Sequence, residues 1–157
     1  MAQAAVVDRF YKAFARRDAA GMAACYHPRA TFEDPAFGPL ERPAACAMWA
    51  LLLSRSADLT VTHEVLGEAG STVMARWEAR YTFTRTGRPV LNRIEATFTI
   101  EDDLIRSHQD RFSFWVWSRQ AFGPVGLLLG WTPWFHAKVQ AEALRALAAY
   151  QAKASSP

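Results

Sequence analysis

Apolar and polar side chains alternate along much of residues 59–116, and this period of two constrains the fold more than any other feature of the chain. In one stretch every second residue is apolar. This apolar set comprises Val73, Ala75, Trp77, Ala79, Tyr81 and Phe83. Turn-forming residues at 67–71, 86–87 and 101–103 divide the region into strands. The pattern predicts an antiparallel sheet with one buried face and one polar face.

Helical spacing replaces the period of two on both sides of this region. Val7, Tyr11 and Phe14 recur at about one helical turn, and Asp18 is placed to cap a second, short helix. Pro43 suits the first turn of a third helix. The predicted elements are helices near 7–14, 18–25, 43–52 and 133–149, an extended segment at 30–34, and a last strand at 104–116. Helices gathered before a sheet indicate an α+β protein with helices packed on one face of the sheet.

Composition and charge set the class of protein. With 157 residues, of which 51% are hydrophobic, the chain has the size of one domain spanning 1–157. The formal charge of +3 is mild and no long run of Lys and Arg is present, so we expect neither nucleic acid nor a membrane as a partner. The first residues lack the pattern of a signal peptide, and Cys25 and Cys46 form no disulfide framework. These features predict a cytoplasmic protein.

The sequence carries no motif for a cofactor or a metal. It has no glycine-rich phosphate loop. The run Cys25-Tyr26-His27 is too tight for a zinc site and has no second half elsewhere in the chain. We therefore expect no cofactor and no metal.

The last predicted strand carries the side chains best suited to acid/base chemistry. His108 and Asp110 share its even-numbered face with Phe112 and Phe114. If these phenylalanines face the core, the imidazole and the carboxylate face it too. A buried carboxylate near an imidazole can have its proton affinity tuned toward neutrality. The odd-numbered face carries two tryptophans, which favour the opposite orientation or a contact between subunits, so both orientations stay open.

A second candidate is Asp34, which shares a face with Phe32 in the extended segment. A carboxylate that faces the interior is costly unless it has a partner, so this position invites a functional interpretation. Because Pro35 follows, Asp34 can equally be a turn residue whose side chain bonds nearby backbone amides. In the same way, His108 and Asp110 can be a structural pair whose members satisfy each other.

Three short stretches near the start of the chain resemble, in order and spacing, the opening of a bacterial ketosteroid isomerase. They are Val6-Val7-Asp8-Arg9-Phe10, Arg17-Asp18 and Ala30-Thr31-Phe32-Glu33-Asp34-Pro35. More broadly, the chain resembles the nuclear transport factor 2-like superfamily, which includes SnoaL-like polyketide cyclases and limonene-epoxide hydrolase. The resemblance implies a cone-shaped α+β fold over 1–118, in which a curved antiparallel sheet wraps around N-terminal helices. Residues 119–157 then form an extension with an extra C-terminal helix.

What this resemblance implies for chemistry depends on individual positions. Asp34 matches the acid that moves a proton next to a carbonyl in ketosteroid isomerases. Phe10 occupies the place of the tyrosine that donates to the enolate oxygen, and Glu95, the best match for the second donor, falls on the polar face by strand parity. Losing one oxyanion donor costs about a hundredfold or more in rate. We therefore expect no efficient ketosteroid isomerisation.

Other chemistries of the superfamily use different residues. Polyketide cyclases of this shape often place an acid/base aspartate on a late strand near a histidine, a role that His108 and Asp110 match. Epoxide hydrolases of this fold hold an Asp-Arg-Asp arrangement around a water, which Arg106 with Asp110 and Asp34 resembles. The predicted acid/base set is thus Asp34, His108 and Asp110. The implied substrate-binding wall comprises Phe10, Tyr11, Phe14, Phe32, Trp49, Trp77, Tyr81, Asn92 and Phe98.

Two classes of function follow from the resemblance. The first is an enzyme that moves a proton on a small hydrophobic carbonyl or polyketide-like substrate, with water addition to an epoxide as a further alternative. The second is a noncatalytic module that binds a ligand or dimerises. Both imply a small hydrophobic ligand in the cone pocket, and the family resemblance implies a homodimer formed through the sheet.

The segment 120–131 is apolar and rich in glycine, and it leads into the last predicted helix. So much apolar area invites association if it stays exposed. A lid over the pocket, a dimer arm and an extra core layer are all consistent with it, and a contact with a membrane surface is the weaker fourth choice. We expect this segment to shape or close the pocket.

Overall fold

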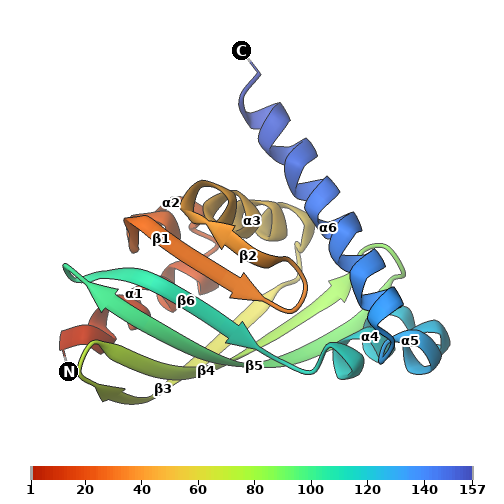
Figure 1. Ribbon diagram of the computed structural model, residues 1–157, viewed down its shortest axis with the longest axis horizontal. Helices are drawn as coiled ribbons and strands as arrows, with labels where there is room; N and C mark the ends of the chain where they lie inside the picture. Colours follow the sequence, from red (N-terminus) through yellow and green to blue (C-terminus); the bar gives the residue numbers. More distant parts are fainter. Residues whose placement is uncertain (1, 157) are drawn as a thin grey trace.

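The computed structural model describes residues 2–156 and shows a curved sheet with helices on one face (Figure 1). The helices are α1 (Ala2–Ala15), α2 (Ala19–Ala24), α3 (Arg42–Arg55), α4 (Phe114–Phe122), α5 (Pro124–Leu129) and α6 (Pro133–Ala154). The strands are β1 (Tyr26–Asp34), β2 (Gly38–Glu41), β3 (Thr60–Ala69), β4 (Thr72–Phe83), β5 (Arg88–Glu101) and β6 (Leu104–Arg111). The α+β class predicted from the sequence is confirmed.

The six strands found in residues 2–156 form one open sheet in the order β2-β1-β6-β5-β4-β3. Neighbouring strands run antiparallel except for β1 and β6, which run parallel. Their register pairs Phe32 with His108. Because alternate residues of a strand share a face, the next pair on this face is Asp34 and Asp110. The parallel pair therefore brings the two predicted acidic residues together from opposite ends of the sequence.

The predicted alternation is present in the central strands. In β4, Val73, Ala75 and Trp77 are buried, whereas Met74 and Arg76 are exposed on the other face. The buried face packs against the first helix, whose apolar stripe supplies part of the core. These core residues of α1 are Val7, Phe10, Tyr11 and Phe14. The period of two thus assigned the correct face of the sheet to the interior.

Local signals explain where the first helices begin. The Asp18 side chain accepts a hydrogen bond from the Gly21 amide at 2.8 Å, which caps α2 as predicted. A proline lies in the first turn of α3, where its missing N–H has no intrahelical partner to lose. Capping and proline placement were therefore readable from the sequence.

Three boundaries differ from the prediction. The first strand begins at Tyr26, not at residue 30, so His27 and Pro28 lie in β1 and do not end a helix. The predicted loop around Gly38 contains the short strand β2, which pairs with β1 in a hairpin. The last strand ends at Arg111, not at residue 116. Pairing with β6, which places Tyr26 opposite Ile105, stabilises the added first residues of β1, and no local pattern reveals such long-range pairing.

The early end of β6 has a local cause. Ser113 has an extended backbone and its Oγ accepts a hydrogen bond from the Val116 amide at 3.2 Å, which caps α4. Phe114 is consequently the first residue of a helix and not a strand residue. Helix α4 also crosses residue 118, the predicted boundary between cone and extension.

Helices α4, α5 and α6 form a second layer against the end of β5. Their small core comprises Val90, Phe114, Trp117, Ala121, Phe135 and Val139. The close approach of α5 to α4 requires glycine at position 126, because a Cβ there would lie 1.9 Å from the Ser118 carbonyl oxygen. Helix α6 then crosses back to contact α3 (Figure 1). Among residues 2–156, no helix has the length and apolar character needed to cross a membrane.

Candidate functional site

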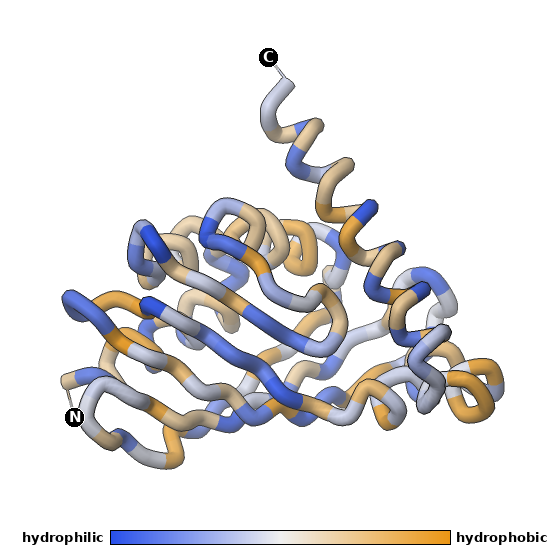
Figure 2. Tube along the Cα trace, viewed as in Figure 1, coloured by the Kyte–Doolittle hydropathy of each residue, from blue (hydrophilic) through white to orange (hydrophobic). Residues whose placement is uncertain are grey.

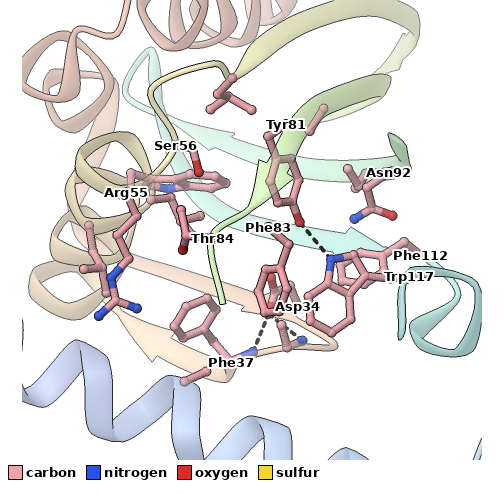
Figure 3. A pocket seen from close by; sticks show the side chains of 18 of the residues that line it. Asp34, Phe37, Arg55, Ser56, Tyr81, Phe83, Thr84, Asn92, Phe112 and Trp117 are labelled. Atoms are coloured by element: carbon pink, nitrogen blue, oxygen red, sulfur yellow. Dashed lines mark hydrogen bonds between the residues drawn. The ribbon is translucent and has the colours of Figure 1, made fainter. Parts of the chain in front are cut away.

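A cavity of about 310 Å³ lies between the inner face of the sheet and the helices α3, α4 and α6. Its walls are mainly apolar and include Phe14, Trp49, Leu52, Trp77, Phe83, Ile94, Phe112, Trp117, Phe122, Val139 and Ala143. The polar lining includes Asp34, Tyr81, Asn92 and Asp110, with Arg55 and Glu142 also contributing. Figure 3 shows Asp34, Tyr81, Asn92 and Trp117 around this space. An apolar hollow with a few polar groups is the usual form of a small-molecule site.

Asp34 is both a turn residue and a lining residue. Its Oδ1 accepts hydrogen bonds from the amides of Phe37 at 2.6 Å and Ala36 at 3.0 Å (Figure 3). Burial raises the pKa of Asp34 to about 7, the Phe37 amide opposes this rise, and the nearby charge of Asp110 adds to it. The carboxyl therefore carries a proton up to near-neutral pH and faces the cavity.

Asp110 lies at the end of a buried chain of hydrogen bonds. Its Oδ1 is 2.8 Å from His108 Nε2, and the Trp77 indole N–H donates to the same oxygen at 3.4 Å. On the far side of the imidazole, His108 Nδ1 is 2.8 Å from the Tyr26 hydroxyl. That hydroxyl accepts the Trp49 indole N–H at 2.9 Å. All of these side chains are buried, so water does not compete for the bonds.

One assignment matches every donor of this chain with an acceptor. Trp49 can only donate, so the Tyr26 oxygen accepts from it, and the Tyr26 proton is then directed to His108 Nδ1. The imidazole then carries its proton on Nε2 and donates it to Asp110. Burial raises the pKa of Tyr26 well above its ordinary value, which keeps this donor protonated. Asp110 Oδ2 has no hydrogen bond within residues 2–156 and remains open to a ligand.

Tyr81 supplies a further donor at the cavity. Its hydroxyl accepts the Trp117 indole N–H at 2.8 Å, which leaves the phenolic proton without an assigned acceptor (Figure 3). Burial raises the pKa of Tyr81, so this proton is retained at physiological pH. The Asn92 amide lines the same space. A bound carbonyl oxygen would therefore find neutral hydrogen-bond donors on the sheet.

The sequence-predicted site residues divide into two groups. Seven of them line the cavity: Phe14, Asp34, Trp49, Trp77, Tyr81, Asn92 and Asp110. Five lie behind it in the core: Phe10, Tyr11, Phe32, Phe98 and His108. The ring centroids of Phe98, Phe32 and Phe10 lie 4.2, 5.0 and 5.5 Å from that of His108. These rings enclose the imidazole and do not present a surface to a ligand.

Two residues considered as oxyanion or water-activating groups lie outside the cavity. Glu95 is exposed on the outer face of β5, as strand parity predicted. Arg106 pairs with Glu101 at 3.2 Å and donates to the Arg29 carbonyl oxygen. The Asp-Arg-Asp arrangement that the resemblance implied with Arg106 is therefore not assembled around the cavity.

Sequence reasoning missed Tyr26 and the aromatic wall of α4. The predicted extended segment began at residue 30, so Tyr26 fell before it. Tyr26 nevertheless has the same even parity as Phe32 and Asp34 and shares their face of the strand. Extending the strand across Pro28 would have revealed it. Trp117 faces the cavity because α4 is a helix, which strand parity did not predict. Phe122, also on α4, lies in the segment 120–131 that was expected to shape the pocket, and it lines the cavity.

A group of possible metal ligands lies far along the sheet from the cavity lining. Within residues 2–156, the donor atoms of His27, Glu101 and Asp102 lie within 4.8 Å of one another. Arg29 and Arg106 already bind the Glu101 carboxylate at 3.0 and 3.2 Å. The Glu101 carboxylate, which would be the best metal ligand of the three, is therefore already paired with two guanidinium groups. We do not regard the cluster of His27, Glu101 and Asp102 as a metal centre.

Comparisons with solved structures show the same fold at low sequence identity. A Catenulispora acidiphila protein with a ketosteroid isomerase-like fold, solved with trimethylamine, is 18% identical with a TM-score of 0.68, over 82% of this chain and 97% of that one. IdmH, a proposed polyketide cyclase from Streptomyces antibioticus, is 21% identical with a TM-score of 0.60, over 69% and 89%. An LEH-like epoxide hydrolase from M. tuberculosis is 15% identical with a TM-score of 0.63, over 82% and 96%.

Sequence comparison identifies the family. No curated protein sequence gives a match. The sequence model of the SnoaL-like domain matches residues 7–108, which include the greater part of α1, all of α2 and α3, and most of the sheet. The match ends within β6, so α4, α5 and α6 lie outside it. By this match and by its fold, the chain belongs to the SnoaL-like domain family.

Proposed function

We propose that the protein binds a small hydrophobic carbonyl compound in the cavity and moves a proton on it by acid/base chemistry. The observation that carries this proposal is the pair of carboxyl groups, Asp34 and Asp110, in a mainly apolar cavity. Their surroundings differ, because burial raises the pKa of Asp34 to about 7 whereas Asp110 receives N–H donors from His108 and Trp77. Two carboxyl groups in different surroundings can divide the roles of acid and base.

In the proposed reaction, Asp110 Oδ2 takes a proton from the carbon next to the carbonyl, and the C–H electron pair moves to form an enolate. His108 holds Asp110 through Oδ1 and so orients the reacting oxygen. The Tyr81 hydroxyl donates a hydrogen bond to the enolate oxygen. Asp34, which is protonated below about pH 7, returns a proton to the enolate. One proton leaves the substrate and one arrives, so no oxidant or reductant is required. Transfer of the proton from Asp110 to Asp34 through water then restores both carboxyl groups.

The dimensions and lining of the cavity support a small, mainly apolar ligand. A volume of about 310 Å³ is at the lower end of the usual range for small-molecule sites, roughly 300–1,000 Å³. The aromatic side chains on β4, α3 and α4 suit the flat faces of an unsaturated ring system. The fold shared with IdmH and with the ketosteroid isomerase-like protein is consistent with this class of ligand.

Deuterium exchange tests the chemical step without knowledge of the natural substrate. Aromatic ketones and cyclic 1,3-diketones would be incubated with the protein in D₂O, and loss of the proton signal next to the carbonyl would be followed by NMR. We expect Asp110→Asn to reduce the enzyme-dependent exchange by about a hundredfold or more. Glu95→Gln removes an exposed carboxylate on the outer face of β5 and serves as the control.

The outcome separates the two functional classes. If ligands raise the melting temperature but the wild-type protein exchanges no protons faster than buffer, the noncatalytic binding module is the better description. If exchange occurs but is unchanged in Asp110→Asn, the assignment of the base is wrong. The proposal requires exchange that depends on both Asp110 and Asp34 and is insensitive to Glu95→Gln.

The predicted homodimer and cytoplasmic location stay predictions. The outer face of β4 and β5 carries charges of both signs, such as Glu78 paired with Arg93 at 3.1 Å, and two copies could match such a surface. Sedimentation velocity at several concentrations would measure the oligomeric state. Cys25 and Cys46 are free thiols, which accords with a reducing compartment.

A further inference from the structure

Exposed apolar side chains are concentrated at one end of the molecule, around α5. Of the nine large hydrophobic residues found exposed within residues 2–156, seven lie between residues 125 and 144. We call six of them the apolar tip: Val125, Leu127, Leu128, Leu129, Trp131 and Trp134. The exposed fractions of Leu128, Trp131 and Trp134 are 69%, 71% and 63%. Figure 2 shows α5 as a hydrophobic end of the fold, to the right of the sheet.

The last four backbone carbonyls of α5 all have hydrogen-bond partners within the protein. The last four carbonyls of a helix normally lack intrahelical partners. In α5, the Gly126 carbonyl accepts the Gly130 amide, and the Leu129 carbonyl accepts both the amide and the hydroxyl of Thr132. Two indole N–H groups satisfy the remaining carbonyls: Trp115 donates to Leu127 at 3.1 Å, and Trp131 donates to Leu128 at 2.9 Å. The tip can therefore enter a medium of low polarity without leaving these carbonyls unpaired.

The surroundings of the apolar tip are basic. No Asp or Glu occurs between residues 111 and 141, whereas Arg119 and Lys138 flank the tip on α4 and α6. The Arg119 guanidinium lies 4.7 Å from the centroid of the Trp115 ring, and the Lys138 ammonium lies 5.4 Å from that of Trp134. Long basic side chains beside tryptophans suit the boundary between lipid headgroups and acyl chains.

We propose that the apolar tip is a peripheral binding site for anionic lipid bilayers. Leucine side chains would enter the outer acyl region, the tryptophans would lie at headgroup level, and Arg119 and Lys138 would contact lipid phosphates. Because the sequence contains no polybasic run and no spanning segment, it predicted no membrane partner, and contact of segment 120–131 with a membrane surface was only the weaker fourth choice. The tertiary structure changes this expectation, since it gathers apolar and basic side chains on one exposed end.

A second copy of the chain is a less suitable occupant of this surface. In a symmetric dimer the same patch lies on both sides of the interface. The basic residues of the two tips would then face each other, and the segment supplies no carboxylate to pair with them. An anionic surface matches both the apolar and the electrostatic character of the tip. The proposal does not depend on the chemistry assigned to Asp34 and Asp110.

Vesicle binding tests this site directly. The full-length protein would be mixed with vesicles of phosphatidylcholine alone or of equal parts phosphatidylcholine and phosphatidylglycerol, and bound protein would be measured by flotation. We expect binding to the anionic vesicles, with a blue shift of tryptophan fluorescence and weakening at high salt. Leu128→Ser combined with Trp131→Ser should reduce the partition coefficient by about tenfold or more. Arg119→Gln and Lys138→Gln should each reduce it by about fivefold.

Matched controls keep the test specific. Leu66→Ser removes an equally apolar side chain that is 47% exposed on β3, away from α5, and should leave vesicle binding unchanged. Circular dichroism and melting temperature would verify that each variant is folded. Equal binding by the tip variants and by Leu66→Ser would overturn the proposal. So would an absence of vesicle binding together with a dimer that Leu128→Ser dissociates, because the occupant would then be a second copy.

Discussion

Replacing Asp34 by Asn should change how the stability of the protein depends on pH. In the unfolded chain this carboxyl ionises near 3.8, whereas burial in the folded protein raises its pKa to about 7. Between these values the unfolded state loses the proton and the folded state keeps it. The stabilising effect of the protonated form is therefore complete below pH 3.8 and is lost as the pH rises through 7.

The magnitude follows from the size of the pKa rise. A rise from 3.8 to about 7 corresponds to about 4 kcal/mol of free energy of unfolding. This value is an upper bound, because the side chain lines the cavity and part of it still meets water. Asn keeps an oxygen that can accept the hydrogen bonds from the Ala36 and Phe37 amides, but it carries no charge. Asp34→Asn should consequently escape the loss of stability at high pH.

Urea unfolding of both proteins across the pH range measures the effect. We expect nearly equal stability at about pH 4 and a gain of up to about 4 kcal/mol for Asp34→Asn at about pH 8. Asp58→Asn is a control in which the change in stability at high pH should have the opposite sign, because hydrogen bonds from Thr82 lower the pKa of Asp58. Its stabilising effect is present above its unfolded pKa and is lost as the pH falls. Asp58→Asn should therefore lose stability relative to the wild type at high pH, not at low pH.

A direct titration tests the same reasoning at the level of the residue. The carboxyl carbon of Asp34 can be followed by NMR, with the Asp34→Asn spectrum identifying its signal. The expected midpoint is about 7. Two results would refute the argument that burial is the main cause of the raised pKa of Asp34. One is a midpoint near the ordinary value of 3.8, and the other is an identical dependence of stability on pH in Asp34→Asn and wild type.

Three further variants test other parts of the structure. Tyr26→Phe leaves Trp49 Nε1 and His108 Nδ1 without their hydrogen-bond partner, so urea unfolding should show a loss of about 1–3 kcal/mol in the free energy of unfolding. Tyr150→Phe is the control and should show little change, because the Tyr150 hydroxyl makes no hydrogen bond within residues 2–156. Gly126→Ala places a Cβ 1.9 Å from the Ser118 carbonyl oxygen, so it should lower the free energy of unfolding by about 1–3 kcal/mol and reduce the melting temperature. Gly67→Ala is the control, because its Cβ would meet only Met74 Cε, at 3.9 Å. Phe10→Tyr introduces the tyrosine found at this place in ketosteroid isomerases, but it adds a hydroxyl to a fully buried cluster of rings. It should therefore lower the melting temperature without producing steroid isomerase activity. A gain of that activity would contradict the placement of Phe10 behind the cavity.

Features with a local physical cause were accessible from the sequence. The alternation in β4 and the helical stripe of α1 determine which side chains are buried, because a strand repeats every two residues and a helix every 3.6. The Asp18 cap and the proline of α3 act within one turn of helix. His108 and Asp110 could be placed on one face of the last strand because they are two residues apart.

Features that depend on distant pairing were not accessible. Parity predicted that residues 112–116 continue the last strand, but packing of α4 against β5, together with the local Ser113 cap, forms a helix from Phe114. The strand β2 is short and exists because β1 pairs with it. Tyr26 joins His108 only because β1 lies beside β6. Whether Asp34 was a turn residue or a pocket residue could not be decided either, and in the structure it is both.

The sequence by itself therefore determined the class of fold, the buried face of the sheet and the residue types available for acid/base chemistry. Tertiary structure alone decided which of those residues meet. It placed Asp34 beside Asp110, put Phe10 behind the cavity and turned the segment after Arg111 into a helical wall with an exposed apolar tip. The physical reason is that hydrophobic periodicity is a local property of the chain, whereas strand order and helix packing are set by the free energy of the whole assembled core.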